Sequence, residues 1–181
     1  MANHPVNGQS IKKPCHITQE RLKELLHYDP ETGVFTWLVR MSQRVMPGDI
    51  AGGRSHEYLT IKIFGKTYKA HRLAWLYVYG DLPSRVDHRD GQGSHNWIEN
   101  LRPCTQVQNV ANSRVKSNNV SGLKGVRRRK GCRNWEARIC VGRRSIHLGT
   151  FETAELAHEF YCLAADMLHG EFSNHGTHKH A

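Results

Sequence analysis

The sequence predicts an α+β protein made of two small units joined by a short polar linker. Stretches in which apolar and polar residues alternate indicate β-strands, and apolar stripes at helical spacing indicate helices. Both patterns occur on each side of a polar segment at residues 115–123. A chain of 181 residues has room for one domain or for two small ones.

The chain is expected to begin with a flexible polar arm over residues 1–16. A helix follows, with Thr18 as its N-cap and three leucines between residues 22 and 26 as its apolar stripe. This helix is expected to end near residues 28–30, because proline disfavours helix in the residue before it. Residues 34–37 then read as a strand.

Residues 40–56 carry Pro-Gly and Gly-Gly pairs and are expected to form a connecting loop. Apolar and polar residues alternate over residues 59–63, and a Gly-Lys turn leads to a hairpin partner at residues 67–70. Residues 71–78 are a compact apolar run, which we expect to form a helix ended by Gly80.

A short β-capable run ends in Asp87-His88, and a Gly/Ser/Asn loop then leads to Asn100, Arg102 and Asn109. A carboxylate and an amide oxygen can hold a hard cation such as Mg²⁺. A neutral imidazole can take a proton from an attacking water near physiological pH. An acidic residue beside a histidine therefore suits phosphodiester hydrolysis, in which the cation offsets charge on the phosphoryl oxygens.

This stretch resembles the HNH endonucleases of the phage and homing type, whose pattern reads DH…N(x)8N. The resemblance implies a ββα-metal (His-Me finger) unit, in which two strands and a helix surround one metal ion. It implies His88 as the general base and Asp87 and Asn109 as metal ligands. It also implies that Asn100 ties the loop together through hydrogen bonds to the backbone. The final asparagine favours one Mg²⁺ or Mn²⁺ ion over zinc.

Other residues near this pattern have two interpretations. Arg102 is included among the catalytic candidates as a phosphate contact, and a structural ion pair is the equal alternative. His71 is expected to orient its helix and pack near the site, and His95 and Asn96 are expected to shape the loop. An Asp-His pair alone can be a capped turn, and an asparagine in a Gly-rich loop can be a turn former. The four pattern residues together, in a basic chain, favour a site.

Residues 115–123 are predicted to be a flexible linker, because they are polar and rich in Asn and Ser. The nuclease-like domain, with its N-terminal α+β extension, would then span residues 17–114. A second domain would span residues 124–172, and residues 173–181 would form a tail.

The second domain is predicted to contain three strands and a helix. Residues 125–129 and 133–141 form the first two strands, and residues 145–148 form a third that Gly149 stops. One face of this sheet should bury against a helix that Thr153 caps, while the opposite face carries arginines. The expected apolar stripe of the helix consists of Leu156, Ala157, Phe160, Tyr161, Ala164, Met167 and Leu168.

Residues 122–172 resemble the AP2 DNA-binding domain in the phrases KGVRRR, WEARI and HLGTFETAELA. The resemblance implies a three-stranded antiparallel sheet, packed on one helix, that lies in the DNA major groove. At three positions where that family contacts DNA, this chain has different residues, namely Cys140, Ser145 and His147. The base preference of the family is therefore not carried over. The predicted DNA-binding residues are Lys124, Arg127, Arg129, Arg138, Arg143 and Arg144.

The composition favours a polyanion as partner, because 26 Lys and Arg residues against 16 acidic ones give a net charge of +10. Scattered surface charge is usually solvated, but three consecutive arginines repel one another unless a polyanion is near. No long apolar run or basic amphipathic helix supports a membrane partner. We expect double-stranded DNA as the partner, no small-molecule substrate and a monomeric protein.

The five cysteines form no C-x-x-C pair and are odd in number, which argues against a disulfide framework or a structural zinc site. The N-terminus lacks the apolar core of a signal peptide. We therefore expect the protein in the cytoplasm, and the HNH resemblance implies that this is the cytoplasm of a bacterial host cell. The HNH resemblance implies that a phage or mobile element encodes it.

The sequence thus predicts a metal-dependent DNA endonuclease of the HNH homing type that docks on DNA through an AP2-like domain. The main alternative is an AP2-type sequence-specific DNA-binding regulator with an inactive nuclease unit. An RNA-binding or RNA-cutting protein ranks lower because the RNP aromatic pattern is absent. A structural protein with a basic surface would leave the DH…N…N pattern unexplained.

Overall fold

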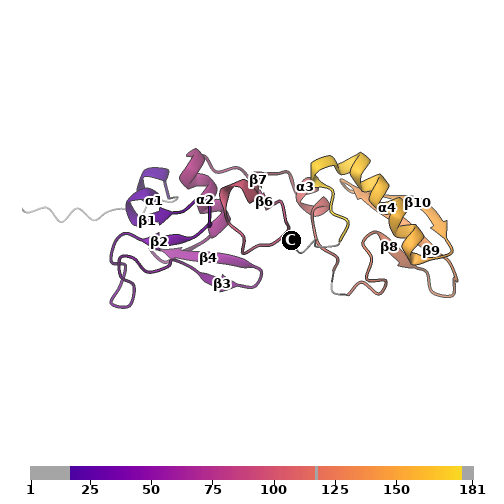
Figure 1. Cartoon of the computed structure of the whole chain (residues 1–181), viewed down its shortest axis with the longest axis horizontal. Coiled ribbons are helices and arrows are strands. Elements are labelled where there is room, and N and C mark those ends of the chain that lie inside the picture. Colours follow the sequence, from indigo (N-terminus) through magenta and orange to yellow (C-terminus); the bar gives the residue numbers. More distant parts are fainter. Residues whose placement is uncertain (1–16, 117, 177–181) are drawn as a thin grey trace, which may run out of the picture.

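The computed structural model describes residues 17–116 and 118–176. The predicted arm at residues 1–16, one linker position and the last five residues of the predicted tail lie outside these ranges. The fold is α+β, and the described residues form four small antiparallel sheets (Figure 1). None of the helices in these ranges combines the length and the apolar content needed to cross a membrane.

The first helix begins as predicted but ends earlier. In α1 (Gln19–Leu25), the Thr18 hydroxyl accepts a hydrogen bond from the backbone N–H of Arg21. The predicted end near residues 28–30 is wrong, because β1 (Leu26–Tyr28) pairs antiparallel with β2 (Phe35–Trp37). Both ends of β1 are buried and its centre is exposed, which is the period of a strand.

A second sheet is formed by β3 (Gly53–Ser55), β4 (Tyr58–Ile63) and β5 (Lys66–Lys69). The prediction of a loop over residues 40–56 missed β3, which is exposed along its whole length and therefore carries no apolar alternation. The predicted hairpin of β4 and β5 is present, and α2 (Ala70–Tyr79) follows and ends at Gly80, as predicted. The core lies between α1, α2 and these sheets.

The candidate site lies on the next elements of the chain. The strands β6 (Val86–His88) and β7 (Leu101–Pro103) pair antiparallel, so that His88 faces Leu101 in the register. A loop and the 3-10 turn η1 (Ile98–Asn100) connect them. The helix α3 (Gln106–Ala111) then starts at a capping box formed by Thr105 and Gln108.

The C-terminal sheet packs on one helix, as predicted. The strands β8 (Val126–Arg128), β9 (Trp135–Val141) and β10 (Arg144–Phe151) lie in the order β10-β9-β8 against α4 (Ala154–His169). The prediction that Gly149 stops the third strand is wrong. Instead β10 continues across an irregularity between His147 and Gly149, which leaves Leu148 outside the paired register and lets the strand reach Phe151.

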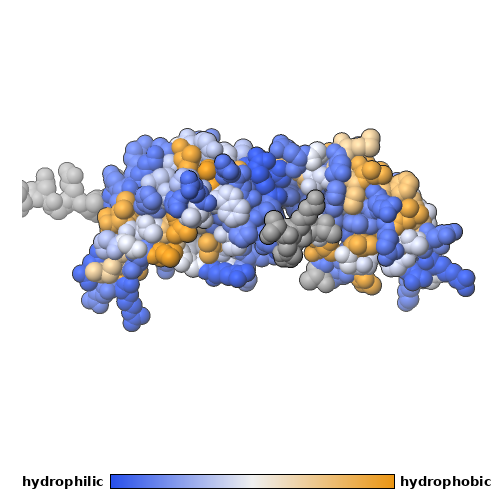
Figure 2. Space-filling model, viewed as in Figure 1, coloured by the Kyte–Doolittle hydropathy of each residue, from blue (hydrophilic) through white to orange (hydrophobic). Residues whose placement is uncertain are grey.

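The buried face of α4 agrees with the predicted stripe at Ala157 and Tyr161 and differs at most other positions. Its most buried positions are Ala154, Ala157, Tyr161 and Ala165, which recur at helical spacing. The large residues Leu156, Phe160, Met167 and Leu168 are exposed, and Figure 2 shows apolar surface over this helix. Small alanines allow the helix to approach the sheet closely, and three of its four buried residues therefore contribute little to a search for large apolar side chains.

The end of α4 brings the chain back to the first unit. The turn η2 (Gly170–Phe172) follows α4, and Phe172 packs with Cys104 and Ala111. In the predicted linker, Asn119 Nδ2 donates to the carbonyl of Leu123 at 2.9 Å. The packing of Phe172 on Cys104 and Ala111 joins the two units in addition to the chain, while the exact domain boundaries stay predictions.

Candidate active site

A cleft of about 770 Å³ holds the residues of the predicted pattern. Asp87 and His88 line it from β6, Asn109 lines it from α3, and Tyr58 lines it from β4. The chain that follows α3, at residues 112–116, forms another side. Three side chains of the predicted pattern, which are separated by up to 22 positions from Asp87 to Asn109, therefore face one space.

His88 is held by a hydrogen bond that defines its tautomer. Its Nε2 lies 3.0 Å from the Oδ1 of Asn96, and the Nδ2 of Asn96 donates to the carbonyl of Ser94 at 3.2 Å. Because Nδ2 is occupied in this way, Oδ1 faces the imidazole, and His88 donates its Nε2–H. The Nδ1 of the neutral ring is then the atom that can accept a proton.

Burial lowers the pKa of His88, which is only 4% exposed. The hydrogen bond to Asn96 and the charges of Asp90 and Asp87 oppose this shift. Because the net direction is downward, His88 is neutral at physiological pH. A neutral imidazole is the state that a general base needs.

Asn96 was predicted only to shape the loop, and its contacts give it a larger part. It is 1% exposed, and its backbone carbonyl accepts a hydrogen bond from the Tyr28 hydroxyl at 2.7 Å. At Gly33, which has a φ of 74°, a Cβ atom would overlap the backbone of Asn96. The turn between β1 and β2 therefore fixes the residue that orients His88.

Asn100 ties the loop together as the resemblance implies. Its Nδ2 donates to Asp90 Oδ1 at 3.0 Å and to the carbonyl of His95 at 2.8 Å. Its Oδ1 accepts the backbone N–H of Asp90 at 3.1 Å. Asn100 does not line the cleft, so it acts on His88 through the loop that carries Asn96.

Asp87 presents one oxygen to donors and leaves the other free for a cation. Its Oδ2 accepts hydrogen bonds from Arg102 Nε at 3.2 Å, Arg102 Nη2 at 3.1 Å and Asn112 Nδ2 at 2.9 Å. Oδ1 accepts none from the described part of the chain. Burial raises the pKa of Asp87, and the bonds from Arg102 and Asn112 oppose that shift.

Asn112 is a site residue that the sequence reasoning missed. The same Nδ2 that reaches Asp87 also donates to the carbonyl of His88 at 2.7 Å, and the residue is 4% exposed. It lies three positions after Asn109, at the C-terminal end of α3. That spacing puts both amides on one side of the helix, which is the signal that could have indicated it.

Asp87 and Asn109 offer donors that suit a hard divalent cation. Both line the cleft, and the Asn109 amide makes no hydrogen bond with the described residues. These residues contain no group of three or more His, Cys, Asp or Glu side chains placed to hold a metal. One carboxylate and one amide oxygen, completed by water and phosphate oxygens, match the way in which proteins bind Mg²⁺.

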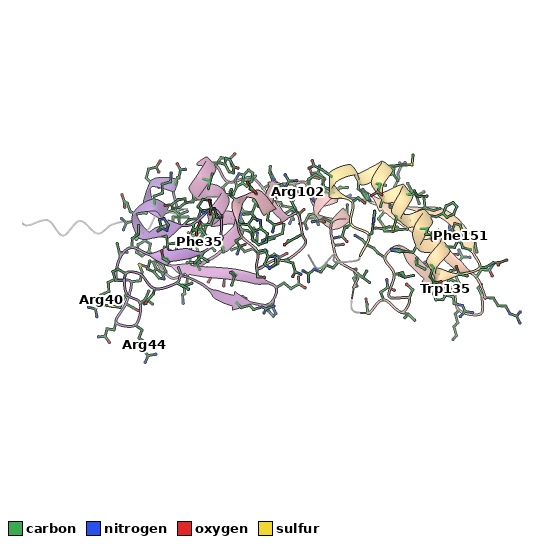
Figure 3. All side chains as sticks on the ribbon, viewed as in Figure 1. Phe35, Arg40, Arg44, Arg102, Trp135 and Phe151 are labelled. Atoms are coloured by element: carbon green, nitrogen blue, oxygen red, sulfur yellow. The ribbon has the colours of Figure 1, made fainter. Side chains whose placement is uncertain are left out.

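Arg102 has the geometry of the predicted alternative, the structural ion pair. Its side chain is 6% exposed and forms a buried ion pair with Asp87. Its Nη1 donates to the carbonyl of Glu171 at 2.7 Å, and its guanidinium carbon lies 3.7 Å from the centre of the Phe172 ring. Figure 3 labels Arg102 where the two units meet. The Arg102 side chain does not line the cleft.

His71 packs against the site, as expected from the sequence. Its ring lies 4.8 Å from the ring of His88 and 5.3 Å from that of Tyr58. It is 4% exposed, and its Nδ1 has no hydrogen-bond partner among the described residues. Burial lowers the pKa of His71 to about 3, so this ring is neutral beside His88.

The predicted DNA-binding arginines surround one acidic residue of the sheet. Glu136 accepts from Arg127 Nε at 2.9 Å and pairs with Arg129 Nε at 2.7 Å, and Arg138 Nη1 lies 3.9 Å away. The bond from Arg127 and the neighbouring charges lower the pKa of Glu136. This carboxylate is 6% exposed, whereas Arg127 and Arg129 are largely exposed.

The other predicted DNA-binding residues lie elsewhere. Arg143 and Arg144 are exposed at the turn between β9 and β10. Lys124 lies apart from them, because its Nζ donates to the carbonyls of Ala111 and Ser113, each at 2.6 Å. Burial lowers the pKa of Lys124 to about 8. The structure therefore brings three of the predicted arginines together and uses Lys124 to join the two units.

Comparison with known proteins finds one matching family model and two similar proteins. Residues 68–111 match the family model of the HNH endonucleases, and this segment contains Asp87, His88 and Asn109. The chain is 26% identical over 114 residues to "Protein 3.8" of Escherichia phage T7, with 62% of this chain and 93% of that protein covered.

The chain is also similar to a plant protein. It is 33% identical over 111 residues to "AP2-like ethylene-responsive transcription factor ANT" of Arabidopsis thaliana. This similarity covers 58% of the chain but only 20% of that protein, so the chain spans about a fifth of its length. The two resemblances predicted from the sequence, to HNH endonucleases and to AP2 proteins, are thereby confirmed.

Proposed function

We propose that the HNH endonuclease domain makes this protein a metal-dependent enzyme that hydrolyses phosphodiester bonds in double-stranded DNA. In this proposal β6, β7 and α3 form the ββα-metal unit, and the sheet β8–β10 docks on the duplex as an AP2-type domain. The observation that carries the proposal is that a neutral, oriented imidazole and a carboxylate with one free oxygen face the same cleft.

His88 is the general base of the proposed reaction. Its Nδ1 takes a proton from the attacking water, while the bond from Nε2–H to Asn96 keeps the ring in place. The negative charge of Asp87 lies next to it in the chain and stabilises the imidazolium that forms. Removing such a base typically lowers the rate by a factor of about 10² to 10⁴.

Asp87 Oδ1 and the Asn109 amide oxygen would hold a Mg²⁺ or Mn²⁺ ion. A bound ion would supply positive charge to the phosphoryl oxygens as they become more negative. Arg102 and Asn112 keep the Asp87 carboxylate in one orientation by binding its Oδ2. We therefore assign Arg102 a positioning role through Asp87, and no direct contact with phosphate.

The arginines around Glu136 are proposed to contact DNA from the exposed face of the C-terminal sheet. Arginine suits forked contacts with phosphate oxygens and guanine edges. The Glu136 carboxylate holds Arg127 and Arg129 in place before DNA binds, which lowers the entropy lost on binding. A net charge of +10 adds attraction that does not depend on base sequence.

The similarity to a plant transcription factor supports one alternative, a DNA-binding regulator whose nuclease unit is inactive. Both proposals predict DNA binding, and cleavage separates them. The similarity to a phage protein supports our expectation that the protein acts in the cytoplasm of a bacterial host cell. One site per chain makes a nick the simplest product.

The test is the conversion of supercoiled plasmid to open circles in Mg²⁺, in Mn²⁺ and in EDTA. The unaltered protein should nick in either metal and not in EDTA. His88→Ala should nick at least about 100-fold more slowly while its gel-shift affinity is retained. The matched control is His27→Ala, which changes an exposed histidine on β1 and should nick at the normal rate. Equal nicking by His88→Ala would refute the assignment.

A further inference from the structure

The segment that follows α4 contacts the candidate active site although it belongs to the other unit. Glu171 accepts the Nη1–H of Arg102 through its backbone carbonyl at 2.7 Å. Phe172 lies beneath the same guanidinium and packs on Cys104 and Ala111. These contacts join residues separated by about 70 positions in the sequence.

Asn174 makes the second contact of this segment. Its Nδ2 donates to the backbone carbonyl of Asn112 at 3.0 Å and to the Asn112 Oδ1 at 3.3 Å. The Nδ2 of Asn112 is thereby left to bond Asp87 and the carbonyl of His88. Asn174 thus fixes which way the Asn112 amide faces.

Arg102 and Asn112 are the two side chains that bind Oδ2 of Asp87, and the segment after α4 supports both. One path runs from Asn174 through Asn112 to Asp87. The other runs from Glu171 and Phe172 through Arg102 to the same carboxylate. Lys124 also joins the units at the end of α3, so the junction is supported from the start of the C-terminal unit too.

We infer that residues 171–174 are a positioning element of the nuclease centre, supplied by the end of the unit that docks on DNA and the start of the tail that follows it. Asn174 and Phe172 are its positioning residues, and they act through Asn112 and Arg102 on Asp87. Metal binding and cleavage then require that the end of the DNA-docking unit is seated against β7 and α3. This inference rests on the proposed function, because it assigns Asp87 the metal.

The physical reason is that the carboxylate must present Oδ1 to the cleft in one orientation. Such sites tolerate displacements of only about 0.5 Å, and loss of a residue that orients a metal ligand typically costs about 10- to 100-fold in affinity or activity. Without Asn174, the Asn112 amide can turn, and its donor to Asp87 is lost. The Asp87 carboxylate would then rotate about its remaining bonds to Arg102.

The first experiment compares Asn174→Ala with His175→Ala in the full-length chain. His175 is the neighbouring residue, and its imidazole pairs with Asp166 of α4 at 2.7 Å instead of reaching the site. For Asn174→Ala, the Mg²⁺ concentration that half-saturates plasmid nicking should rise by about 10-fold or more. Gel-shift affinity in EDTA should be unchanged, and His175→Ala should match the unaltered protein in both measurements.

The second experiment measures metal binding without cleavage. Calorimetric titration with Mn²⁺ in the absence of DNA should give weaker binding by about 10-fold for Asn174→Ala and normal binding for His175→Ala. In an Asn112→Ala background, Asn174→Ala should have almost no additional effect on Mn²⁺ affinity, because it acts through Asn112. Normal Mn²⁺ affinity of Asn174→Ala, or full additivity of the two changes, would overturn the inference.

Phe172→Leu keeps an apolar side chain against Cys104 and Ala111 and removes the ring under Arg102. It should weaken Mn²⁺ binding in the same direction, and it decides the matter if Asn174→Ala does not fold. If the unaltered protein cleaves DNA, and Asn174→Ala and Phe172→Leu bind metal and cleave normally, the inference fails while the proposed function stands. If the unaltered protein cleaves in neither metal, the proposed function fails, while the Mn²⁺ titrations still test the positioning role.

Discussion

The buried histidine beside the active site should make the protein less stable in mild acid. His71 lies on α2 and its ring packs against the rings of both Tyr58 and His88, while its Nδ1 has no partner among the described residues. Burial lowers its pKa to about 3, while a histidine in an unfolded chain has a pKa near 6.5. Protonation of this ring therefore favours the unfolded chain.

The sign and size of the effect follow from proton linkage. The folded pKa is below the unfolded one, so the stability contributed by neutral His71 is present above about pH 6.5 and is lost as the pH falls toward 3. Each unit between the two values is worth about 1.4 kcal/mol. From pH 7 to pH 5, His71 alone should lower the free energy of unfolding by about 2 kcal/mol.

The assay is urea unfolding followed by tryptophan fluorescence at pH 7 and at pH 5. His71→Phe keeps an aromatic ring against Tyr58 and His88 and removes the proton site. The loss of unfolding free energy between the two pH values should therefore be about 2 kcal/mol smaller in His71→Phe than in the unaltered protein. His27→Phe, at an exposed position of β1, serves as the control and should retain the full loss. An equal loss in His71→Phe would refute the reasoning.

Three further predictions concern cleavage and DNA binding. Because burial lowers the pKa of His88, single-turnover nicking measured between pH 5 and 8 should reach its half-maximum below pH 6.5; a half-maximum at or above pH 6.5 would contradict this. Asn96→Ala removes the acceptor of the His88 Nε2–H and should slow nicking by about 10-fold or more with unchanged gel-shift affinity; normal nicking would show that the bond does not orient the base. Arg127→Ala and Arg129→Ala should each weaken DNA binding and reduce the slope of log affinity against log salt by about 1. Arg40→Ala, an exposed arginine of the first unit, is the control for these two, and unaltered slopes in both sheet variants would exclude this face as the docking surface.

The sequence predicted the parts of the fold whose signals are local. The Thr18 cap, the hairpin of β4 and β5, the Gly80 end of α2 and the sheet packed on α4 each follow from neighbouring residues. The missed strand β3 is exposed on both faces, so no apolar alternation marks it. In α4 the burial falls on Tyr161 and three alanines, and the small alanine side chains leave the larger exposed residues to dominate the apolar pattern.

The residues of the candidate site could also be predicted only in part from the sequence. The spacing from Asp87 to Asn109 could be read along the chain, and these residues do line one cleft. Asn96 was predicted only to shape the loop and Asn112 was missed, because their importance comes from the atoms that they bond across the loop and the helix end. The support from Asn174 could not be predicted, because it depends on how two units pack together. Tertiary contacts of this kind leave no periodic signal in the sequence.

The most direct measurement is the Mg²⁺ dependence of supercoiled-plasmid nicking by the unaltered protein and by Asp87→Ala, with gel-shift affinity in EDTA measured beside it. If a carboxylate and an imidazole on β6 cut DNA with the help of a divalent ion, the unaltered protein should nick in Mg²⁺, and Asp87→Ala should bind DNA normally and leave the plasmid supercoiled. Nicking at the normal rate by Asp87→Ala, or DNA binding without nicking by the unaltered protein in both Mg²⁺ and Mn²⁺, would contradict the assignment of this cleft as a nuclease centre.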